Sequence, residues 1–251
     1  MKEMSKSSIG TSSESSLHRT LKYRYTDSGK TEEEIAGFIA DGINPKGEII
    51  EVQLGSFGPL KKKIEAFISI GKVTIIHPII INKFIEVHDD NGKLLYRRKS
   101  PRKGSEWDLF NNLLYAPELA LIPGLNIELI LVDVTEKRIK DGKGSWRRKG
   151  ISIQDRELCA WHSCIILSKL KHYRRFIPFE NNEEFTAAQL GKKAGINTSL
   201  SGKTVYVLNK INVIKKIGKK NRAWLYQPSD ISSASRLCSA KRSVTARRSS
   251  R

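Results

Sequence analysis

EIAGFIADGI (34–43), NPKG (44–47) and EIIEVQL (48–54) are the three consecutive pieces of sequence that decide the fold. Turn-forming residues separate two apolar runs, so we expect strands over residues 34–43 and 48–54. Asp41 and Glu51 then lie near the ends of two adjacent strands, where two carboxylates can meet. This pair is the first candidate for a functional site.

The neighbouring segments predict an alternation of helix and strand. Apolar spacing favours a helix from Glu14 to about Arg24 and another from Leu60 to about Gly71. Residues 73–81 form a continuous apolar, β-branched run, which is typical of a strand buried on both faces. This order predicts an α/β fold.

Further along, Asn91-Gly92 predicts a hairpin between strands at 84–87 and 94–98. We also expect a helix over 107–114, a strand over 127–134, a basic loop or hairpin over 137–151 and a connecting helix over 154–170.

The charge balance points to a polyanionic partner. The chain of 251 residues carries 45 Lys and Arg against 26 Asp and Glu, a formal charge of +19. Such a field attracts nucleic acid, so DNA is the expected partner.

The sequence has no apolar run long enough to span a bilayer, no lipidation signal and no signal peptide at its start. We therefore expect no membrane partner and a cytoplasmic protein that is nucleoid-associated when bound to DNA. The cysteines, Cys159, Cys164 and Cys238, form no CxxC pair and have no histidine at zinc spacing, which fits a reduced compartment.

The carboxylate pair suits a hard cation. Mg²⁺, or Mn²⁺ in its place, binds through one or two carboxylates together with substrate phosphate and activates water. Gln53 projects from the same face of its strand as Glu51 and is a candidate to orient that water. Lys61 or Lys62, at the start of the next helix, is a candidate to reach the scissile phosphate.

The run Asp41…Glu51-Val52-Gln53, between a leading helix and a basic helix, resembles the PD-(D/E)XK nuclease superfamily over roughly residues 14–81. The resemblance implies a restriction-endonuclease-like αβββαβ core in which Asp41 and Glu51 bind Mg²⁺. Gln53 stands where the motif has lysine, a departure that Lys61 or Lys62 would compensate, and Glu14 would be the acidic residue of the first helix. Alternatively, Asp41 caps a turn and Glu51 is a solvated charge on an edge strand.

The last part of the chain predicts two short helices and a hairpin. Thr186 is a candidate N-cap, 194–196 supply a turn, 199–209 suit a second helix, and 213–217 and 223–226 suit two strands with a basic tip. This order resembles the winged-helix DNA-binding family, which implies phosphate contacts from Lys203, Lys210, Lys219, Lys220 and Arg222. A winged helix used for protein contacts or dimerisation is the alternative.

Trp146 with Arg147 and Arg148 is a further candidate for nucleic-acid contact, because an aromatic ring can stack on a base while the charges follow the backbone.

The resulting division places polar, disordered ends at 1–13 and 227–251. Between them lie a nuclease-like domain with an extra hairpin and helix (14–135), a basic segment with a connecting helix (136–180) and a winged helix (181–226). The chain resembles uncharacterised bacterial proteins that pair these two domains.

Three functions remain open. The first is a Mg²⁺-dependent DNA endonuclease, for which a homodimer would be usual. The second is a noncatalytic DNA-binding regulator with a degenerate nuclease fold, and the third is an RNA-binding or interaction protein.

Overall fold

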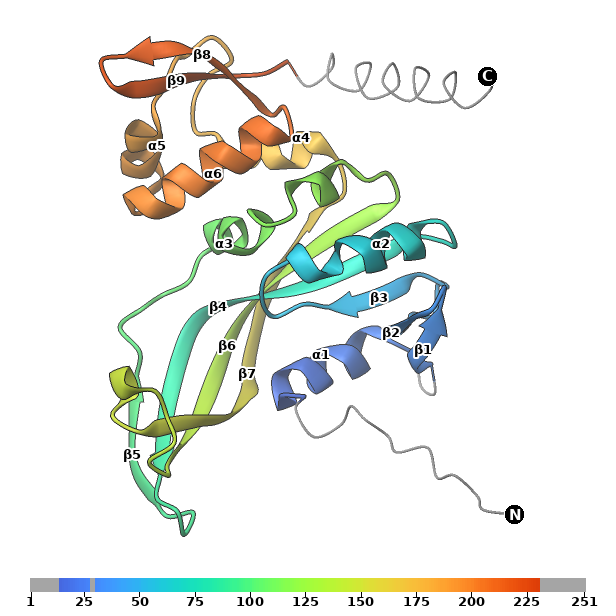
Figure 1. The fold of residues 1–251 in the computed structure, drawn as a ribbon, viewed down its shortest axis with the longest axis vertical. Helices are drawn as coiled ribbons and strands as arrows, with labels where there is room; N and C mark the ends of the chain where they lie inside the picture. Colours follow the sequence, from blue (N-terminus) through green and yellow to red (C-terminus); the bar gives the residue numbers. More distant parts are fainter. Residues whose placement is uncertain (1–13, 28–29, 231–251) are drawn as a thin grey trace. The chain divides into compact units, whose positions relative to one another are not determined.

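The computed structural model describes residues 14–27 and 30–230, and over these ranges the chain has a mixed α/β fold (Figure 1). Its described strands form a seven-stranded sheet of order β1-β2-β3-β4-β6-β7, in which β5 pairs with β4 off this path, and a two-stranded sheet, β8-β9. The chain divides into two compact units. One takes the described residues up to Leu54 with Ile76–Ser105 and Ile130–Cys164, and the other takes Gly55–Ile75, Glu106–Leu129 and the described residues from Ile165 onward.

From α1 to β4 the elements run in the order α, β, β, β, α, β, with three strands where the residues alone predict two. The bounds are α1 Ser16–Tyr25, β1 Thr31–Ile35, β2 Phe38–Ile43, β3 Ile49–Val52, α2 Lys61–Ile68 and β4 Val73–His88.

The remaining elements are β5 Leu94–Lys99, α3 Leu109–Leu113, β6 Leu125–Lys140, β7 Ile151–Leu167, α4 Leu170–Tyr173, α5 Ala187–Ala194, α6 Thr198–Lys210, β8 Ile214–Lys220 and β9 Ala223–Pro228. Short 3₁₀ helices lie at Gly58–Leu60, Glu106–Asp108, Pro117–Leu121, Trp146–Arg148 and Arg174–Phe176.

The deciding stretch contains one more turn than expected. Residues 34–43 do not form a single strand, because Ala36 and Gly37 have φ of 50° and 79° and reverse the chain between β1 and β2. The next turn is as predicted, since the Asn44 side chain accepts hydrogen bonds from the backbone N–H groups of Lys46 and Glu48. Its register pairs Gly42 with Ile50 and Ile43 with Ile49.

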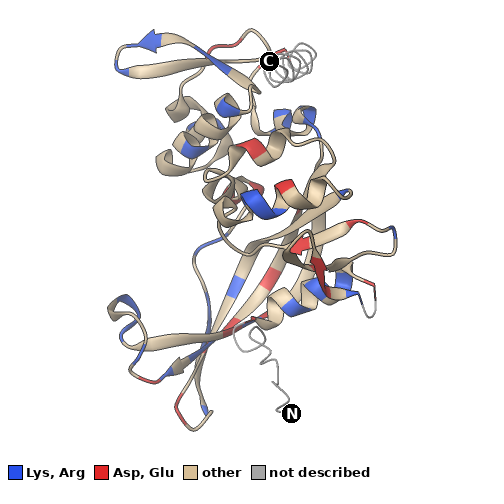
Figure 2. Cartoon of the chain, turned by 45° about the vertical axis from the view of Figure 1, so that its right-hand side comes forward, with Lys and Arg blue, Asp and Glu red and all other residues tan. Residues whose placement is uncertain are grey.

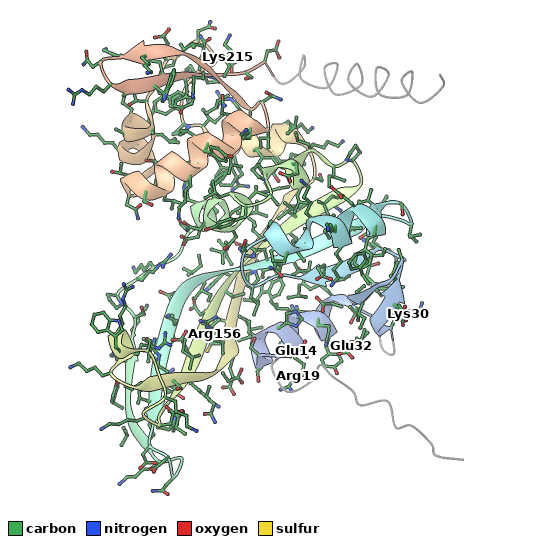
Figure 3. The ribbon with its side chains drawn as sticks, in the orientation of Figure 1. Glu14, Arg19, Lys30, Glu32, Arg156 and Lys215 are labelled. Atoms are coloured by element: carbon green, nitrogen blue, oxygen red, sulfur yellow. The ribbon has the colours of Figure 1, made fainter. Side chains whose placement is uncertain are left out.

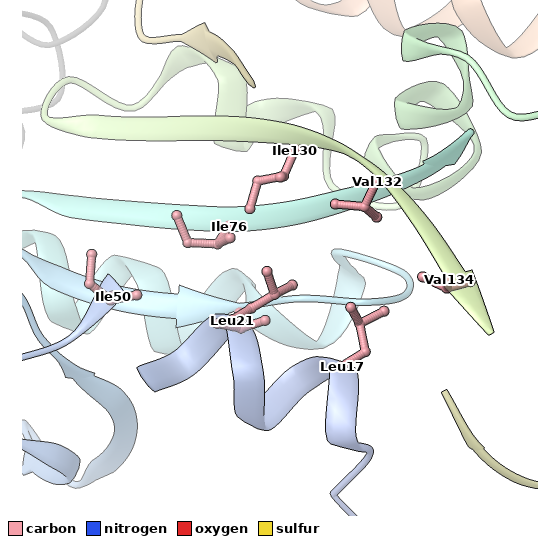
Figure 4. Close-up of a cluster of buried hydrophobic side chains, with 8 residues drawn as sticks. Leu17, Leu21, Ile50, Ile76, Ile130, Val132 and Val134 are labelled. Atoms are coloured by element: carbon pink, nitrogen blue, oxygen red, sulfur yellow. The ribbon is translucent and has the colours of Figure 1, made fainter. Parts of the chain in front are cut away.

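The core beneath α1 ties this helix to three strands. Leu17 and Leu21 pack with Ile50 and Val52 of β3, Ile76 of β4, and Ile130, Val132 and Val134 of β6 (Figure 4). Each of these side chains is at most 2% exposed. Burial of this apolar surface fixes α1 over the sheet.

The connecting helix expected at 154–170 is wrong, because residues 151–167 form the strand β7 next to β6. Leu158, Trp161 and Ile165 recur at spacings of three and four, which imitates a helix. Pairing with β6 keeps the segment extended. The predicted basic segment is therefore the end of β6, a turn with a 3₁₀ helix, and the start of β7.

The first of the C-terminal helices, α5, has the expected N-cap, and α6 has a cap that was not predicted. Thr186 and Gln189 form a capping box at the start of α5, and Gly195 ends this helix with φ of 67°. The Asn197 side chain accepts a hydrogen bond from Leu200 N at the start of α6. Phe185 pairs with Tyr226 of β9, which joins the segment before α5 to the hairpin.

Candidate functional site

The predicted carboxylates lie on paired strands. The register of β2 and β3 pairs Gly42, the residue after Asp41, with Ile50, the residue before Glu51. The Asp41 Oδ2 atom accepts a hydrogen bond of 2.6 Å from Val52 N, so its carboxylate lies between the two strands. Glu51 is only 5% exposed.

The side chains of Asp41 and Glu51 are directed to opposite faces of the sheet. Ile50 and Val52 pack in the core beneath α1, and side chains alternate along a strand, so Glu51 is directed to the opposite face. Asp41 is instead directed toward α1, where its Oδ2 atom lies 3.4 Å from His18 Nε2.

A cluster of charged residues surrounds this contact, and we call Glu14, His18, Lys22, Glu32 and Asp41 the α1 polar cluster. His18 Nδ1 contacts Glu14 Oε1, and His18 Nε2 lies 3.0 Å from the Val52 carbonyl oxygen. Lys22 Nζ lies 2.9 Å from Glu14 Oε1 and 3.1 Å from Glu32 Oε1 (Figure 3 labels both glutamates).

Both ring nitrogens of His18 face acceptors, since a carbonyl oxygen and a carboxylate can only accept. Burial alone would lower the pKa of His18, but the hydrogen bonds and charges of Asp41 and Glu14 outweigh it and raise the pKa from 6.5 to about 9. His18 is therefore an imidazolium at neutral pH, and it links α1 to β2 and β3.

Asp41, one of the two candidate magnesium ligands, has protein contacts in this structure. Its Oδ2 atom accepts a hydrogen bond from Val52 N and contacts His18 Nε2, and the Glu51 side chain is directed to the other face of the sheet. Within 14–27 and 30–230 there is no group of three or more His, Cys, Asp or Glu able to hold a metal ion.

Gln53 and the α2 lysines have other contacts. The Gln53 backbone N–H donates to the Ile76 carbonyl over 2.9 Å, and its own carbonyl accepts from Nδ1 of His77, a core histidine that is 1% exposed. Lys61 Nζ forms a 2.6 Å ion pair with Glu118, and Lys62 is an exposed residue of α2.

The charged hairpin near the C-terminal end of the described chain is a second candidate site. Four lysines lie on β8 and one arginine lies in the turn after it (Figure 2). We call Lys215, Lys216, Lys219, Lys220, Arg222 and Trp224 the basic hairpin. Lys216 Nζ lies 3.8 Å and Lys219 Nζ 4.4 Å from the centroid of the Trp224 ring, which is 43% exposed. These contacts hold an aromatic ring at the surface among cations.

The predicted contacts on α6 divide into two kinds. Lys210 is exposed and lies 5.7 Å from the ring of Tyr206, another exposed residue. Lys203 instead donates a 2.8 Å hydrogen bond to Asn111 Oδ1 and joins α6 to α3.

Trp146 is 83% exposed, with the Arg147 guanidinium 6.0 Å from its ring. Arg148 Nε donates to the Ile151 carbonyl over 3.1 Å, so this arginine stabilises the turn between β6 and β7.

Comparison with known proteins identifies a domain within the chain. Residues 15–168 match the family described as "Domain of unknown function (DUF8091)". The chain belongs to this family. The DUF8091 domain runs from α1 through β7, past the domain boundary expected at 135, and includes His18, Asp41 and Glu51. The basic hairpin lies beyond it.

A protein of Treponema pallidum (strain Nichols), named only as an uncharacterized protein, is 29% identical over 151 residues. The match covers 60% of each chain, so the DUF8091 chain spans less than two thirds of this relative. No solved structure matches.

Sequence reasoning missed His18, Lys22 and Trp224. The spacing of four in Glu14, His18 and Lys22 was a usable signal, because side chains four apart share one face of a helix. Trp224 gave no such signal, since a tryptophan in a short strand is equally typical of a buried core residue.

None of the helices within the described residues is both long enough and apolar enough to cross a membrane.

Proposed function

We propose that this DUF8091 protein binds duplex DNA through α5, α6 and the basic hairpin, in the manner of a winged helix. The observation that carries the proposal is the hairpin itself, which bears five cationic side chains, two of which, Lys216 and Lys219, lie against the exposed Trp224 ring. Phosphate contacts from such residues supply most of the affinity of nonspecific DNA binding.

The arrangement of these elements supports the same proposal. Phe185, directly before α5, pairs with Tyr226 of β9, so the two helices and the hairpin are tied into one module. In this proposal α6 acts as the recognition helix. The exposed Ser199, Tyr206 and Lys210 of α6 are available for contacts in a groove.

The test is fluorescence anisotropy with a labelled duplex, comparing the native protein with Lys219→Ala/Lys220→Ala. Loss of two phosphate contacts is expected to weaken binding roughly tenfold or more. Lys46→Ala/Lys72→Ala removes two exposed lysines that lie outside the helices and strands and is the charge-matched control. Equal affinities for the two double variants would exclude a specific role for the hairpin, and preference for structured RNA in competition would exclude duplex DNA as the main partner.

Metal-dependent DNA cleavage is a second candidate, favoured by the α1-β1-β2-β3-α2-β4 order and by the places of Asp41 and Glu51 on two paired strands. It would require Asp41 to exchange its contact with His18 for one with a metal. The assay incubates duplex and branched DNA with Mg²⁺, Mn²⁺ or EDTA, with Asp41→Ala and Glu51→Ala in parallel. Cleavage that depends on metal and is lost in both variants would establish this activity, whereas binding without cleavage would leave a noncatalytic protein.

A further inference from the structure

We propose that the DUF8091 domain contains a binding site for a phosphoryl group, formed by Lys83, Arg138 and Arg156 around the buried carboxylate of Glu136. We call these four residues the Glu136 cluster. It lies in the DUF8091 domain and does not depend on the basic hairpin.

The cluster is assembled by three neighbouring strands. Glu136 and Arg138 are two residues apart on β6 and so project from the same face. The strands β4 and β7 lie on either side of β6 in the sheet, and each contributes one cation, Lys83 and Arg156 respectively (Figure 3 labels Arg156).

The Glu136 carboxylate holds all three cations in place. Its Oε1 atom accepts from Arg138 Nε at 2.8 Å, and its Oε2 atom accepts from Arg156 Nε at 3.0 Å and from Lys83 Nζ at 3.4 Å. Glu136 is completely buried. Burial alone would raise its pKa, but the hydrogen bonds from Arg138 and Arg156 outweigh this effect and lower the pKa, so the carboxylate stays charged.

The cluster carries more positive charge than the carboxylate requires. A buried carboxylate needs a well-aligned partner, and Arg138 provides one with two donors. Lys83 and Arg156 add two further positive charges, so the four residues together carry a net charge of +2. Cations gathered this closely repel one another, and an anion placed before them would relieve the repulsion.

The surplus donors are accessible. The side chains of Arg156 and Lys83 are 37% and 27% exposed, while the carboxylate beneath them is covered. The Glu136 contacts use Nε of Arg156 and leave both of its terminal nitrogens as donors. A planar guanidinium with two adjacent nitrogens and an ammonium beside it match the oxygens of a phosphoryl group.

The test measures the thermal stability of the full chain with low-millimolar inorganic phosphate against chloride of equal ionic strength. Phosphate is expected to raise the melting temperature of the native protein. Arg156→Ala is expected to weaken phosphate binding tenfold or more, because it removes a charge-assisted hydrogen bond. Two cations still balance Glu136 in this variant, and Lys83→Ala is a second variant that leaves both arginines in place.

Lys137→Ala is the matched control, since it removes the cation next to Glu136 on the same strand but from the opposite face, where Lys137 pairs with Glu157. It should keep the full response to phosphate. Absence of a phosphate effect on the native protein, or the same effect in Arg156→Ala and Lys137→Ala, would overturn the proposal.

A second arm separates two sources of the phosphoryl group. A 5′-mononucleotide that matches inorganic phosphate would identify a free phosphate ester, whereas a short duplex whose binding is weakened by Arg156→Ala would identify the nucleic-acid backbone. If the native protein binds DNA but does not respond to phosphate, the Glu136 proposal fails and the function proposed for the hairpin stands. If it responds to phosphate but does not bind DNA, the function proposed for the hairpin fails and the Glu136 proposal stands.

Discussion

At the scale of single residues, His18 carries the clearest chemical consequence. Its pKa of about 9 in the folded protein exceeds the ordinary value of 6.5, so protonation favours the folded state. The stabilisation by His18 is fully present below pH 6.5 and is lost as the pH rises through 9. The shift corresponds to roughly 2 to 4 kcal/mol of unfolding free energy.

Urea unfolding of the native protein and of His18→Gln checks this prediction. We expect a large difference in unfolding free energy at pH 6 and almost none at pH 10. An NMR titration of the His18 ring that gives a midpoint near 6.5 would contradict it.

For Tyr173 we predict that removing a polar group raises the stability of the fold. Its side chain is buried, and its hydroxyl has no hydrogen-bond partner among the described residues. A buried polar group left unpaired costs about 1 to 3 kcal/mol. Tyr173→Phe should therefore raise the melting temperature, while the same change at Tyr115, which is 65% exposed, should have little effect. A lower melting temperature for Tyr173→Phe would mean that the hydroxyl is satisfied.

At the scale of elements, the caps of the C-terminal helices are open to a direct test. Thr186 accepts a hydrogen bond from Gln189 N, and the Gln189 side chain accepts from Thr186 N. Thr186→Ala removes the first of these bonds and should cost about 1 kcal/mol of stability. Thr198→Ala is the control, because Thr198 is an exposed residue of the first turn of α6 and is not its cap. Equal stability of the two variants, measured by chemical denaturation, would contradict the role of the capping box.

The same elements show where sequence reasoning succeeds. Local signals placed α5, α6 and the β8-β9 hairpin close to their observed bounds, since capping residues, Gly195 and alternating apolar residues act within a few positions. The strand β7 was predicted as a helix, because only pairing with β6, more than ten residues away along the chain, decides its conformation. The turn at Ala36-Gly37 was missed since alanine rarely adopts positive φ.

In the candidate site, too, local features were predictable from the sequence and contacts between distant segments were not. The pairing of the two strands that carry Asp41 and Glu51 was predicted from one local turn, and the register of β2 and β3 shows this pairing. The direction of Asp41 toward His18 depends on how α1 packs over the sheet, which no local pattern encodes. The Glu136 cluster draws on three strands far apart in sequence and was equally out of reach.

At the scale of the whole molecule, the formal charge of +19 makes association with polyanions strongly dependent on salt. This charge alone predicts weak, uniform binding to any nucleic acid. A winged-helix role for the basic hairpin predicts more, because Lys219 and Lys220 would each release one counterion on contacting a phosphate.

The most direct measurement is therefore the salt dependence of duplex DNA binding by the native protein and by Lys219→Ala/Lys220→Ala. The slope of the logarithm of the binding constant against the logarithm of the salt concentration should become shallower by about 2 in the variant. The control Lys46→Ala/Lys72→Ala should keep the native slope. Identical slopes for all three proteins, or no measurable binding of duplex DNA by the native protein, would contradict the proposed function.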